Sequence, residues 1–154
     1  MIAGCGMPMD AVVSDFIAGA AEILSPDAAP AHWDVIEGQG SLFHPAYAAV
    51  SLGLLHGSQP DVLVLCHEPG RSHLLGYPDF PTPSIEDAIA THLRTSALTN
   101  SRVRCAGISF NTSALAPDEA ADMLERSSRS LGLPIADPLR GGASFERLVD
   151  SCLN

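Results

Sequence analysis

Three apolar, strand-like runs of the sequence each end in side chains that can transfer protons or form directed hydrogen bonds. These side chains are Glu37 after the first run, His67 and Glu68 after the second, and Asn111 and Thr112 after the third. Because the carboxyl ends of parallel strands meet at one edge of a sheet, we expect these residues to share a crevice. A carboxylate, an imidazole and an amide in one crevice suit the binding of a small polar substrate and acid–base chemistry on it.

The segment after Glu37 has the composition of a ligand-binding loop. Glycine at positions 38 and 40 lets the backbone turn with positive φ and removes the Cβ atoms that would keep a ligand from main-chain N–H groups. The small, apolar segment 47–56 then predicts a helix whose N-terminus faces the same crevice. Glycines that only bend the chain are the alternative. In the ligand-binding interpretation, the residues that contact substrate or cofactor are Gly38, Gln39, Gly40 and Ser41.

Three ionisable side chains around this loop and the second run could also act on a substrate. Glu37 could coordinate Mg²⁺ on a nucleotide or hold a substrate amine. His44 could accept a proton from an ammonium nucleophile, and its alternative role is to cap the next helix. Arg71 could pair with a substrate carboxylate or a CoA phosphate, or it could be solvated. The sequence leaves these alternatives open.

His67, Glu68 and His73 are close enough in the sequence to raise the question of a metal site. Adjacent residues on a strand point to opposite faces, and no fourth ligand is evident nearby. We therefore predict no bound metal, and we expect His67 and Glu68 to form a hydrogen-bonded pair that lines the crevice.

The apolar pattern predicts alternating strands and helices that would position these residues. The run 61–66 has no polar alternation, so both of its faces should be buried. Gly57 should end the second helix, and the loop 67–83 is long enough to fold over a site. The alternation predicts an α/β fold with a three-layer, mostly parallel sheet in a single domain. Strands are expected at 33–37, 61–66, 102–109 and 133–136, and helices at 10–24, 47–56, from Ser84, 117–131 and 144–153.

Composition and charge narrow the class of partners. The chain has 154 residues, which suits one domain, and its formal net charge is −10, with no lysine among its 8 basic residues. We therefore do not expect the chain to bind nucleic acid or a membrane, and we expect a small-molecule substrate. Four cysteines without a C-x-x-C pair predict reduced, buried thiols and a cytoplasmic location. No apolar run approaches the roughly 20 residues that span a bilayer.

Several stretches of the sequence resemble known families. The segment 37–42, Glu-Gly-Gln-Gly-Ser-Leu, is similar to the E-G-x-G-G-L element of dethiobiotin synthetase and related P-loop folds. The resemblance to the D-glutamate N-acetyltransferase family, whose C-terminal domain was long catalogued as a domain of unknown function, covers nearly the whole chain. It implies a P-loop NTPase-like α/β domain and acetyl transfer from acetyl-CoA to the amine of D-glutamate or other D-amino acids. The stretches that carry it are 34–45, 51–60, 65–69 and 107–113.

The resemblance also implies a segment that these residues do not contain. Family members should have an N-terminal Rossmann-like domain and a G-x-x-x-x-G-K-[ST]-like phosphate loop on a strand upstream of the matched region. This chain has no lysine to supply such a loop. We therefore expect residues 1–154 to be a partial C-terminal domain that lacks the Walker A loop and its strand. By itself it should be poorly stable and almost inactive, and it should pair with its missing half or form a homo-oligomer.

Three functions are compatible with these observations. The first is an acyl transferase that binds acetyl-CoA and a D-amino acid, with catalytic groups at Glu37, His44 and His67 and an oxyanion stabilised by main-chain N–H groups of the glycine loop. The second is an enzyme of the dethiobiotin synthetase type, in which Glu37 binds Mg²⁺ and ATP activates a carboxylate. The third is a non-catalytic remnant that depends on a partner. In the first function, substrate or cofactor is also bound by Glu68, Arg71, Asn111 and Thr112.

Overall fold

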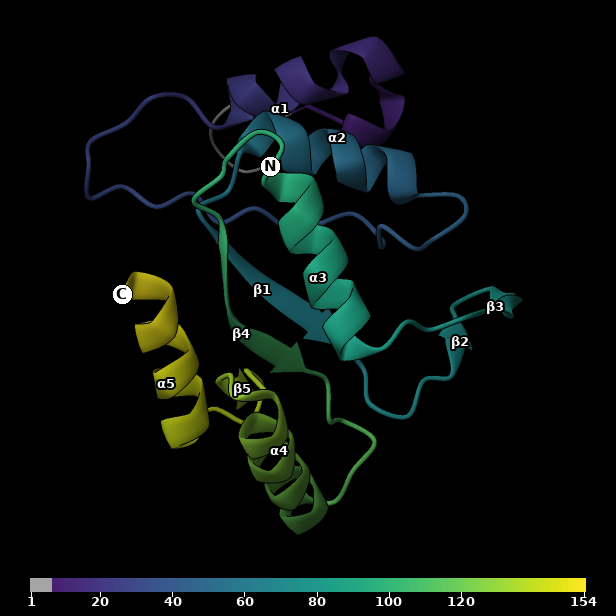
Figure 1. Cartoon of the computed structure of the whole chain (residues 1–154), viewed down its shortest axis with the longest axis vertical. Helices are drawn as coiled ribbons and strands as arrows, with labels where there is room; N and C mark the ends of the chain where they lie inside the picture. Colours follow the sequence, from purple (N-terminus) through teal and green to yellow (C-terminus); the bar gives the residue numbers. More distant parts are fainter. Residues whose placement is uncertain (1–6) are drawn as a thin grey trace. The chain divides into compact units, whose positions relative to one another are not determined.

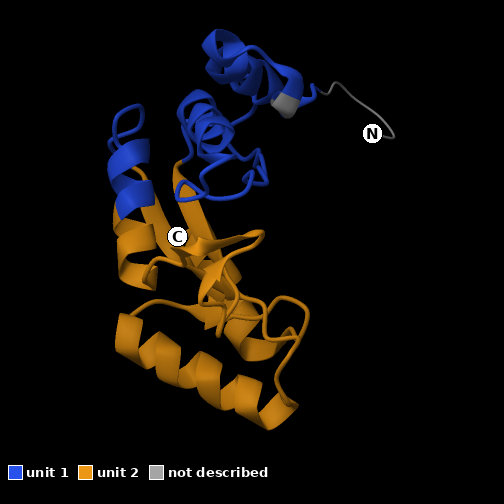
Figure 2. Ribbon diagram, turned by 90° about the vertical axis from the view of Figure 1, so that its right-hand side faces the viewer, with its two compact units in different colours: residues 1–60, 91–102 blue, residues 61–90, 103–154 orange. Residues whose placement is uncertain are grey.

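The computed structural model describes residues 7–154, in which helices come first along the chain and strands alternate with helices only from residue 77 onward (Figure 1). The chain divides into two compact units, one made of residues up to 60 together with 91–102, the other of residues 61–90 and 103–154 (Figure 2). The thiol predicted at Cys5 lies outside the described residues.

The first unit is built around two helices, α1 (Ile17–Leu24) and α2 (Ala48–Ser58). The helix predicted over 10–24 becomes α-helical only at its second half, after two short 3₁₀ turns, η1 (Met9–Ala11) and η2 (Ser14–Phe16). The two residues between these turns, Val12 and Val13, are extended. β-Branched side chains lose rotamer freedom in a helix, so a pair of valines disfavours a continuous one.

Two glycines let α2 approach α1 closely. A Cβ atom at Gly57 would lie 2.1 Å from the carbonyl oxygen of Ala18, and one at Gly53 would lie 2.3 Å from a methyl carbon of Ile17. The prediction that Gly57 ends the helix is wrong, because the helix continues to Ser58 and Gln59 adopts the left-handed conformation, φ 46°. Gly57 is therefore a contact residue rather than a helix terminator.

The strand predicted at 33–37 is also wrong. These residues form an irregular segment between α1 and α2, and the side chain of Val35 is 95% exposed. A strand needs a neighbour whose backbone satisfies its N–H and C=O groups, and none of the described strands pairs with this segment. An apolar run shows only that the side chains are hydrophobic. Whether the run becomes a strand depends on backbone pairing with residues far away in the sequence.

The second unit contains the parallel sheet that the sequence predicts. Its three strands lie in the order β1–β4–β5, and Ile108 in the central strand pairs with Leu65 on one side and Ile135 on the other. Each strand coincides with a predicted apolar run, to within two residues at either end. The strands are β1 (Val62–His67), β4 (Arg104–Phe110) and β5 (Ile135–Ala136).

Helices cover both faces of this sheet. On one face, Ile108 and Phe110 of β4 form a buried cluster with residues of α3 (Ile85–Ser96) and α4 (Pro117–Leu131). On the other, Gly107 gives room to Leu148 of α5 (Gly142–Leu153), because a Cβ atom at position 107 would lie 2.5 Å from a methyl carbon of that leucine. Alternate residues of a strand point to opposite faces, so the unit has the predicted three-layer α/β architecture.

Two of these helices begin with the signals that the sequence displays. The Ser84 hydroxyl accepts a hydrogen bond from the N–H of Asp87 at 3.0 Å and caps α3. Helix α4 has Pro117 in its first turn, and the left-handed Gly132, φ 66°, ends it. Local capping chemistry is therefore sufficient to predict the bounds of α4.

The segment predicted as the loop 67–83 contains a small antiparallel hairpin, β2 (His73–Leu74) and β3 (Tyr77–Pro81). Gly76, with φ 79°, makes its turn. The sequence did not predict this hairpin for two reasons. Strands of two and five residues are too short to show a periodic pattern, and the prolines at 78 and 81 disfavour the prediction of a strand. Proline is compatible with an edge strand, as found here.

Strand β1 is less buried than predicted. Val64 is 38% exposed and the thiol residue Cys66 is exposed, so the predictions that both faces of the run are buried and that Cys66 is buried are wrong. Among the described strands β1 has only β4 as a neighbour, which places it at the edge of the sheet. Cys105 and Cys152 are half-buried free thiols, and burial raises the pKa of both.

Candidate functional site

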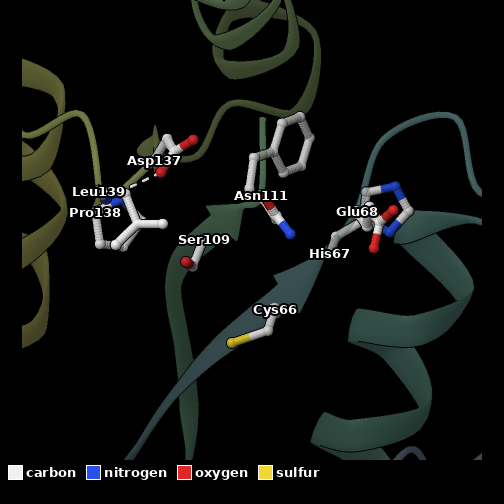
Figure 3. Close-up of a pocket in the computed structure, with 9 residues that line it drawn as sticks. Cys66, His67, Glu68, Ser109, Asn111, Asp137, Pro138 and Leu139 are labelled. Atoms are coloured by element: carbon white, nitrogen blue, oxygen red, sulfur yellow. Dashed lines mark hydrogen bonds between the residues drawn. The ribbon is translucent and has the colours of Figure 1, made fainter. Parts of the chain in front are cut away.

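The carboxyl ends of β1, β4 and β5 line a pocket of about 500 Å³ (Figure 3). Three of the predicted site residues lie together in it, because parallel strands place their carboxyl ends at the same edge of a sheet. The residues that line it are Cys66, His67, Glu68, Ser109, Phe110, Asn111, Asp137, Pro138 and Leu139.

His67 presents a neutral imidazole to this pocket. Partial burial lowers the pKa of His67 from its ordinary 6.5, the Glu68 carboxylate opposes this effect, and the Arg71 charge adds to it. The ring packs at a tilt against Phe110, with the ring centroids 5.4 Å apart. No hydrogen bond from the described residues occupies its nitrogens. His67 is therefore unprotonated at neutral pH and able to accept a proton.

Glu68 is paired with Arg71 and not with His67. Arg71 Nη2 donates to Glu68 Oε2, and the side chains are 39% and 42% exposed, respectively. The predicted hydrogen-bonded pair of His67 and Glu68 is not formed. An ion pair this exposed contributes at most about 1 kcal/mol to stability, so a charged ligand can compete for either partner.

Asn111 is oriented by its neighbours so that its amide nitrogen faces the pocket (Figure 3). Its Oδ1 accepts a hydrogen bond from the N–H of Ser113 at 3.1 Å, and its own backbone N–H donates to the carbonyl oxygen of His67 at 2.9 Å. Because the side-chain oxygen is engaged, the NH₂ group remains as a donor. The pocket thus has a fixed donor suited to a carbonyl oxygen or an anionic oxygen.

Thr112 does not line the pocket but is buried against Asp137 and Arg140, with 1% of its surface exposed. Its hydroxyl and its backbone N–H both donate to Asp137 Oδ2, the latter at 2.9 Å. Arg140 Nε donates to the hydroxyl oxygen at 2.7 Å. Contact between Thr112 and a substrate stays a prediction, and the geometry favours an indirect role.

Asp137 is an ionised carboxylate with 2% of its surface exposed. Burial alone would raise the pKa of its carboxyl, but hydrogen bonds from Thr112 and from the N–H of Leu139, at 2.9 Å, together with the charge of Arg140, hold the pKa below its usual 3.8. The Nε atom of Arg140 is 3.6 Å from Oδ2. The carboxylate is therefore fully engaged by protein groups.

Glu37 lies in the first unit, where it lines a separate cavity of about 280 Å³ with Asp34 and residues of α1 and α2. The structure thus assigns Glu37 to a different unit from His67 and Asn111. Its predicted contact with a substrate amine or with Mg²⁺ stays a prediction.

Local structure explains two residues of the loop after Glu37, namely Gly40 and Ser41. Gly40 has φ 52°, and a Cβ atom there would lie 2.9 Å from Cβ of Tyr47. The Ser41 hydroxyl accepts a hydrogen bond from the N–H of Phe43 at 3.1 Å and closes a turn. Gly38 has no positive φ and open space around it. Ligand contacts by Gly38, Gln39, Gly40 and Ser41 stay predictions.

His44 stabilises the turn that precedes α2. Its Nδ1 accepts a hydrogen bond from the N–H of Ala46 at 3.2 Å, its carbonyl oxygen accepts from Ala48 at 3.1 Å, and its ring stacks on Tyr47. The N–H of Ala46 thus occupies the lone pair of Nδ1. These bonds give His44 a structural role in the turn before α2, although no side chain caps the helix itself. Proton acceptance by His44 stays a prediction.

Within residues 7–154, no three His, Cys, Asp or Glu side chains lie close enough together to hold a metal ion. None of the described helices is both long and apolar enough to cross a membrane.

Sequence reasoning missed the third wall of the pocket, which Asp137, Pro138 and Leu139 provide. The signal was present, because Asp137 directly follows the predicted strand 133–136 and the rule for parallel strand ends applies to it as well. The exposed wall residue Leu139 has no such signal.

A parallel sheet with helices on both faces and a pocket at its carboxyl edge defines an α/β domain of the doubly wound class. The family model described as "Domain of unknown function (DUF1611_C) P-loop domain" matches residues 1–149. The chain belongs to this family.

Similar proteins agree with this assignment. A D-glutamate N-acetyltransferase from Pseudoalteromonas sp is 53% identical over 142 residues, which are 92% of this chain and 43% of that protein. One from Tritonibacter scottomollicae is 48% identical over 151 residues, 98% of this chain and 45% of that protein. A crystal structure of a DUF1611 family protein from Anabaena variabilis matches with a TM-score of 0.83 and 33% identity, over 97% of this chain and 44% of that one. The chain spans less than half the length of each.

Proposed function

We propose that this chain provides the pocket of an N-acetyltransferase that moves the acetyl group of acetyl-CoA to the amine of D-glutamate or another D-amino acid. The observation that carries the proposal is the 53% identity to a D-glutamate N-acetyltransferase over 92% of the chain. The 48% identity to a second protein of the same name supports it. A cytoplasmic location and a homo-oligomeric state stay predictions.

The pocket contains groups suited to the attacking amine. The Glu68 carboxylate attracts the substrate ammonium group, and the neutral His67 imidazole accepts its proton. The amine nitrogen then attacks the carbonyl carbon of the thioester, a C–N bond forms, and the C–S bond breaks. The CoA thiolate leaves and takes up a proton, so that free thiol and the N-acetyl amino acid are the products.

As the amine attacks, negative charge develops on the carbonyl oxygen of the thioester. A hydrogen-bond donor must stabilise this oxygen. Asn111 supplies one, because its side-chain NH₂ faces the pocket while its oxygen is held by Ser113. Removal of one such donor from an acyl-transfer enzyme costs roughly 100- to 1000-fold in rate. The pocket lining includes two carboxylates and no arginine, and Arg71, which pairs with Glu68, is positioned for a carboxylate of D-glutamate.

The test is a chimera in which this chain replaces the matching segment of the Pseudoalteromonas protein. The purified chimera is incubated with acetyl-CoA and D-glutamate, and free thiol is followed, with L-glutamate as the control acceptor. The proposal expects thiol release that depends on the D-amino acid, and His67→Gln should reduce it by about 100-fold. A folded chimera that releases no thiol would refute the proposal, and turnover of ATP with Mg²⁺ instead would point to carboxylate activation.

A further inference from the structure

The loop after β4 and the loop after β5 both line the pocket, and one buried network joins these two loops. The loop after β4 contributes Asn111, and the loop after β5 contributes Pro138 and Leu139. The residues that join the loops are Thr112 and Asp137, which are 1% and 2% exposed. Nothing in the proposed reaction uses these two residues directly.

The Thr112 hydroxyl is the centre of the network. It donates to Asp137 Oδ2 and at the same time accepts from Arg140 Nε at 2.7 Å, so it links a buried anion to a cation. The backbone N–H of Thr112 adds a second bond to Oδ2, at 2.9 Å. A serine could make the same side-chain contacts, whereas a valine of nearly the same shape could make none of them.

Arg140 fixes the loop after β4 at two further points. Its Nη2 donates to the carbonyl oxygen of Thr112 at 2.9 Å and to that of Leu115 at 2.8 Å. Its Nε is also 3.6 Å from Asp137 Oδ2. A planar guanidinium can reach these acceptors together, and a lysine ammonium on a single stem cannot.

Asp137 acts as an anchor in this arrangement and not as a proton acceptor. Its Oδ1 accepts the N–H of Leu139 at 2.9 Å, and its Oδ2 accepts both donors of Thr112. The same carboxylate therefore holds the residue after Asn111 and the residue after Pro138. Both loops therefore depend on this one carboxylate for their position.

We propose that Thr112 and Arg140 are positioning residues, which act through Asp137 and Asn111 to hold the Asn111 amide at the place where it donates to the ligand in the pocket. The identity of that ligand rests on the proposed function, whereas the network itself does not. A donor displaced from an oxyanion weakens the transition state more than the bound substrate, so the loss should appear in kcat rather than in KM.

The test compares Thr112→Val, which removes the hydroxyl, with Thr112→Ser, which keeps it. In the chain itself, NMR follows the side-chain NH₂ signals of Asn111 and the backbone amide of Leu139. We expect both to shift in Thr112→Val and to stay near their original positions in Thr112→Ser. In the active chimera, we expect kcat for thiol release to fall at least 10-fold in Thr112→Val, with KM for acetyl-CoA within 2-fold, and to recover to within 3-fold in Thr112→Ser.

Other outcomes would contradict either the positioning role of Thr112 and Arg140 or the proposed reaction. Unchanged Asn111 signals in Thr112→Val, or an equal loss of kcat in the serine variant, would overturn the proposal. If Thr112→Val does not fold, the variant Arg140→Lys is measured in its place, and it should lower kcat at least 5-fold. An unchanged kcat in Arg140→Lys would also contradict the proposal. If no chimera releases thiol, the proposed reaction fails, and the Asn111 and Leu139 signals still decide whether the network sets the pocket.

Discussion

Two histidines that look equivalent in the sequence differ in what their ring nitrogens can do. The Nδ1 atom of His44 accepts a hydrogen bond from Ala46, whereas the ring of His67 has no such bond among the described residues and faces the pocket. In the chimera, we therefore expect His67→Gln to lower kcat by about 100-fold and His44→Gln to change it less than 3-fold while lowering the melting temperature. Thiol release and thermal unfolding measure the two effects, and equal losses of kcat would contradict the assignment.

The same histidine predicts a pH dependence of the rate. Burial lowers the pKa of His67 below 6.5, and only the unprotonated ring accepts a proton from the amine. The rate should therefore be constant near neutral pH and fall as the pH decreases through a midpoint below 6.5. A profile of kcat/KM between pH 5 and 8 measures it, and a midpoint clearly above 6.5 would assign the proton transfer to another group.

The carboxyl group of Asp137 should make the free energy of unfolding depend on pH in the acidic range. The pKa of its carboxyl is lower in the folded state than the ordinary 3.8, so its contribution is complete above 3.8 and is lost as the pH falls through the folded-state value. We expect Asp137→Asn to lower the free energy of unfolding at pH 7 by about 3 kcal/mol, because it removes the charge of a buried, hydrogen-bonded pair.

Urea unfolding at pH 7 and at pH 3 tests this expectation. The variant should lose less stability between these two pH values than the unchanged chain. Asp79→Asn is the matched control, since Asp79 is exposed, and it should change the free energy of unfolding by less than about 0.5 kcal/mol. Equal effects of the two substitutions would contradict a special role for Asp137.

At the scale of elements, the contact between α1 and α2 depends on glycine for space. A methyl group at Gly57 would lie 2.1 Å from a backbone oxygen, which cannot move as a flexible side chain does. Alanine favours a helix by about 1 kcal/mol over glycine, yet we expect Gly57→Ala to destabilise the first unit by about 1–3 kcal/mol through overpacking.

Gly19 in α1 provides the matched control. Nothing lies within 4 Å of a Cβ atom built there, so Gly19→Ala should instead stabilise the helix by up to about 1 kcal/mol. Thermal unfolding of the two variants should therefore shift in opposite directions. A shift in the same direction would show that the two helices are not packed as closely as the structure indicates.

The elements that the sequence predicts well are those whose signals are local. Helix α4 carries its first-turn proline and its terminal glycine within 16 residues, and β4 contains the apolar run 105–108. The segment 33–37 fails because its apolar residues have no described strand to pair with. The pocket was predictable where a strand ends in a polar residue. The network of Thr112, Asp137 and Arg140 was not, because it joins residues 25 and 28 positions apart.

At the scale of the whole molecule, much apolar surface is left uncovered. In the first unit, Val13, Phe16 and Ile23 are 66%, 69% and 67% exposed, although they belong to the apolar pattern that predicted a helix. The residues of α1 that do become buried are Ile17, Ala20 and Ala21. Large apolar side chains that stay exposed in this number favour association.

We therefore expect the purified chain to associate with itself. Sedimentation equilibrium at increasing protein concentration should give an average mass that rises above 16.1 kDa. The double variant Phe16→Ser with Ile23→Ser should stay monomeric at the same concentrations, because it removes the largest apolar side chains of this surface. Leu98→Ser, at a 76% exposed position elsewhere in the first unit, is the control and should leave the association unchanged. A monomer at every concentration would mean that these side chains are simply solvated.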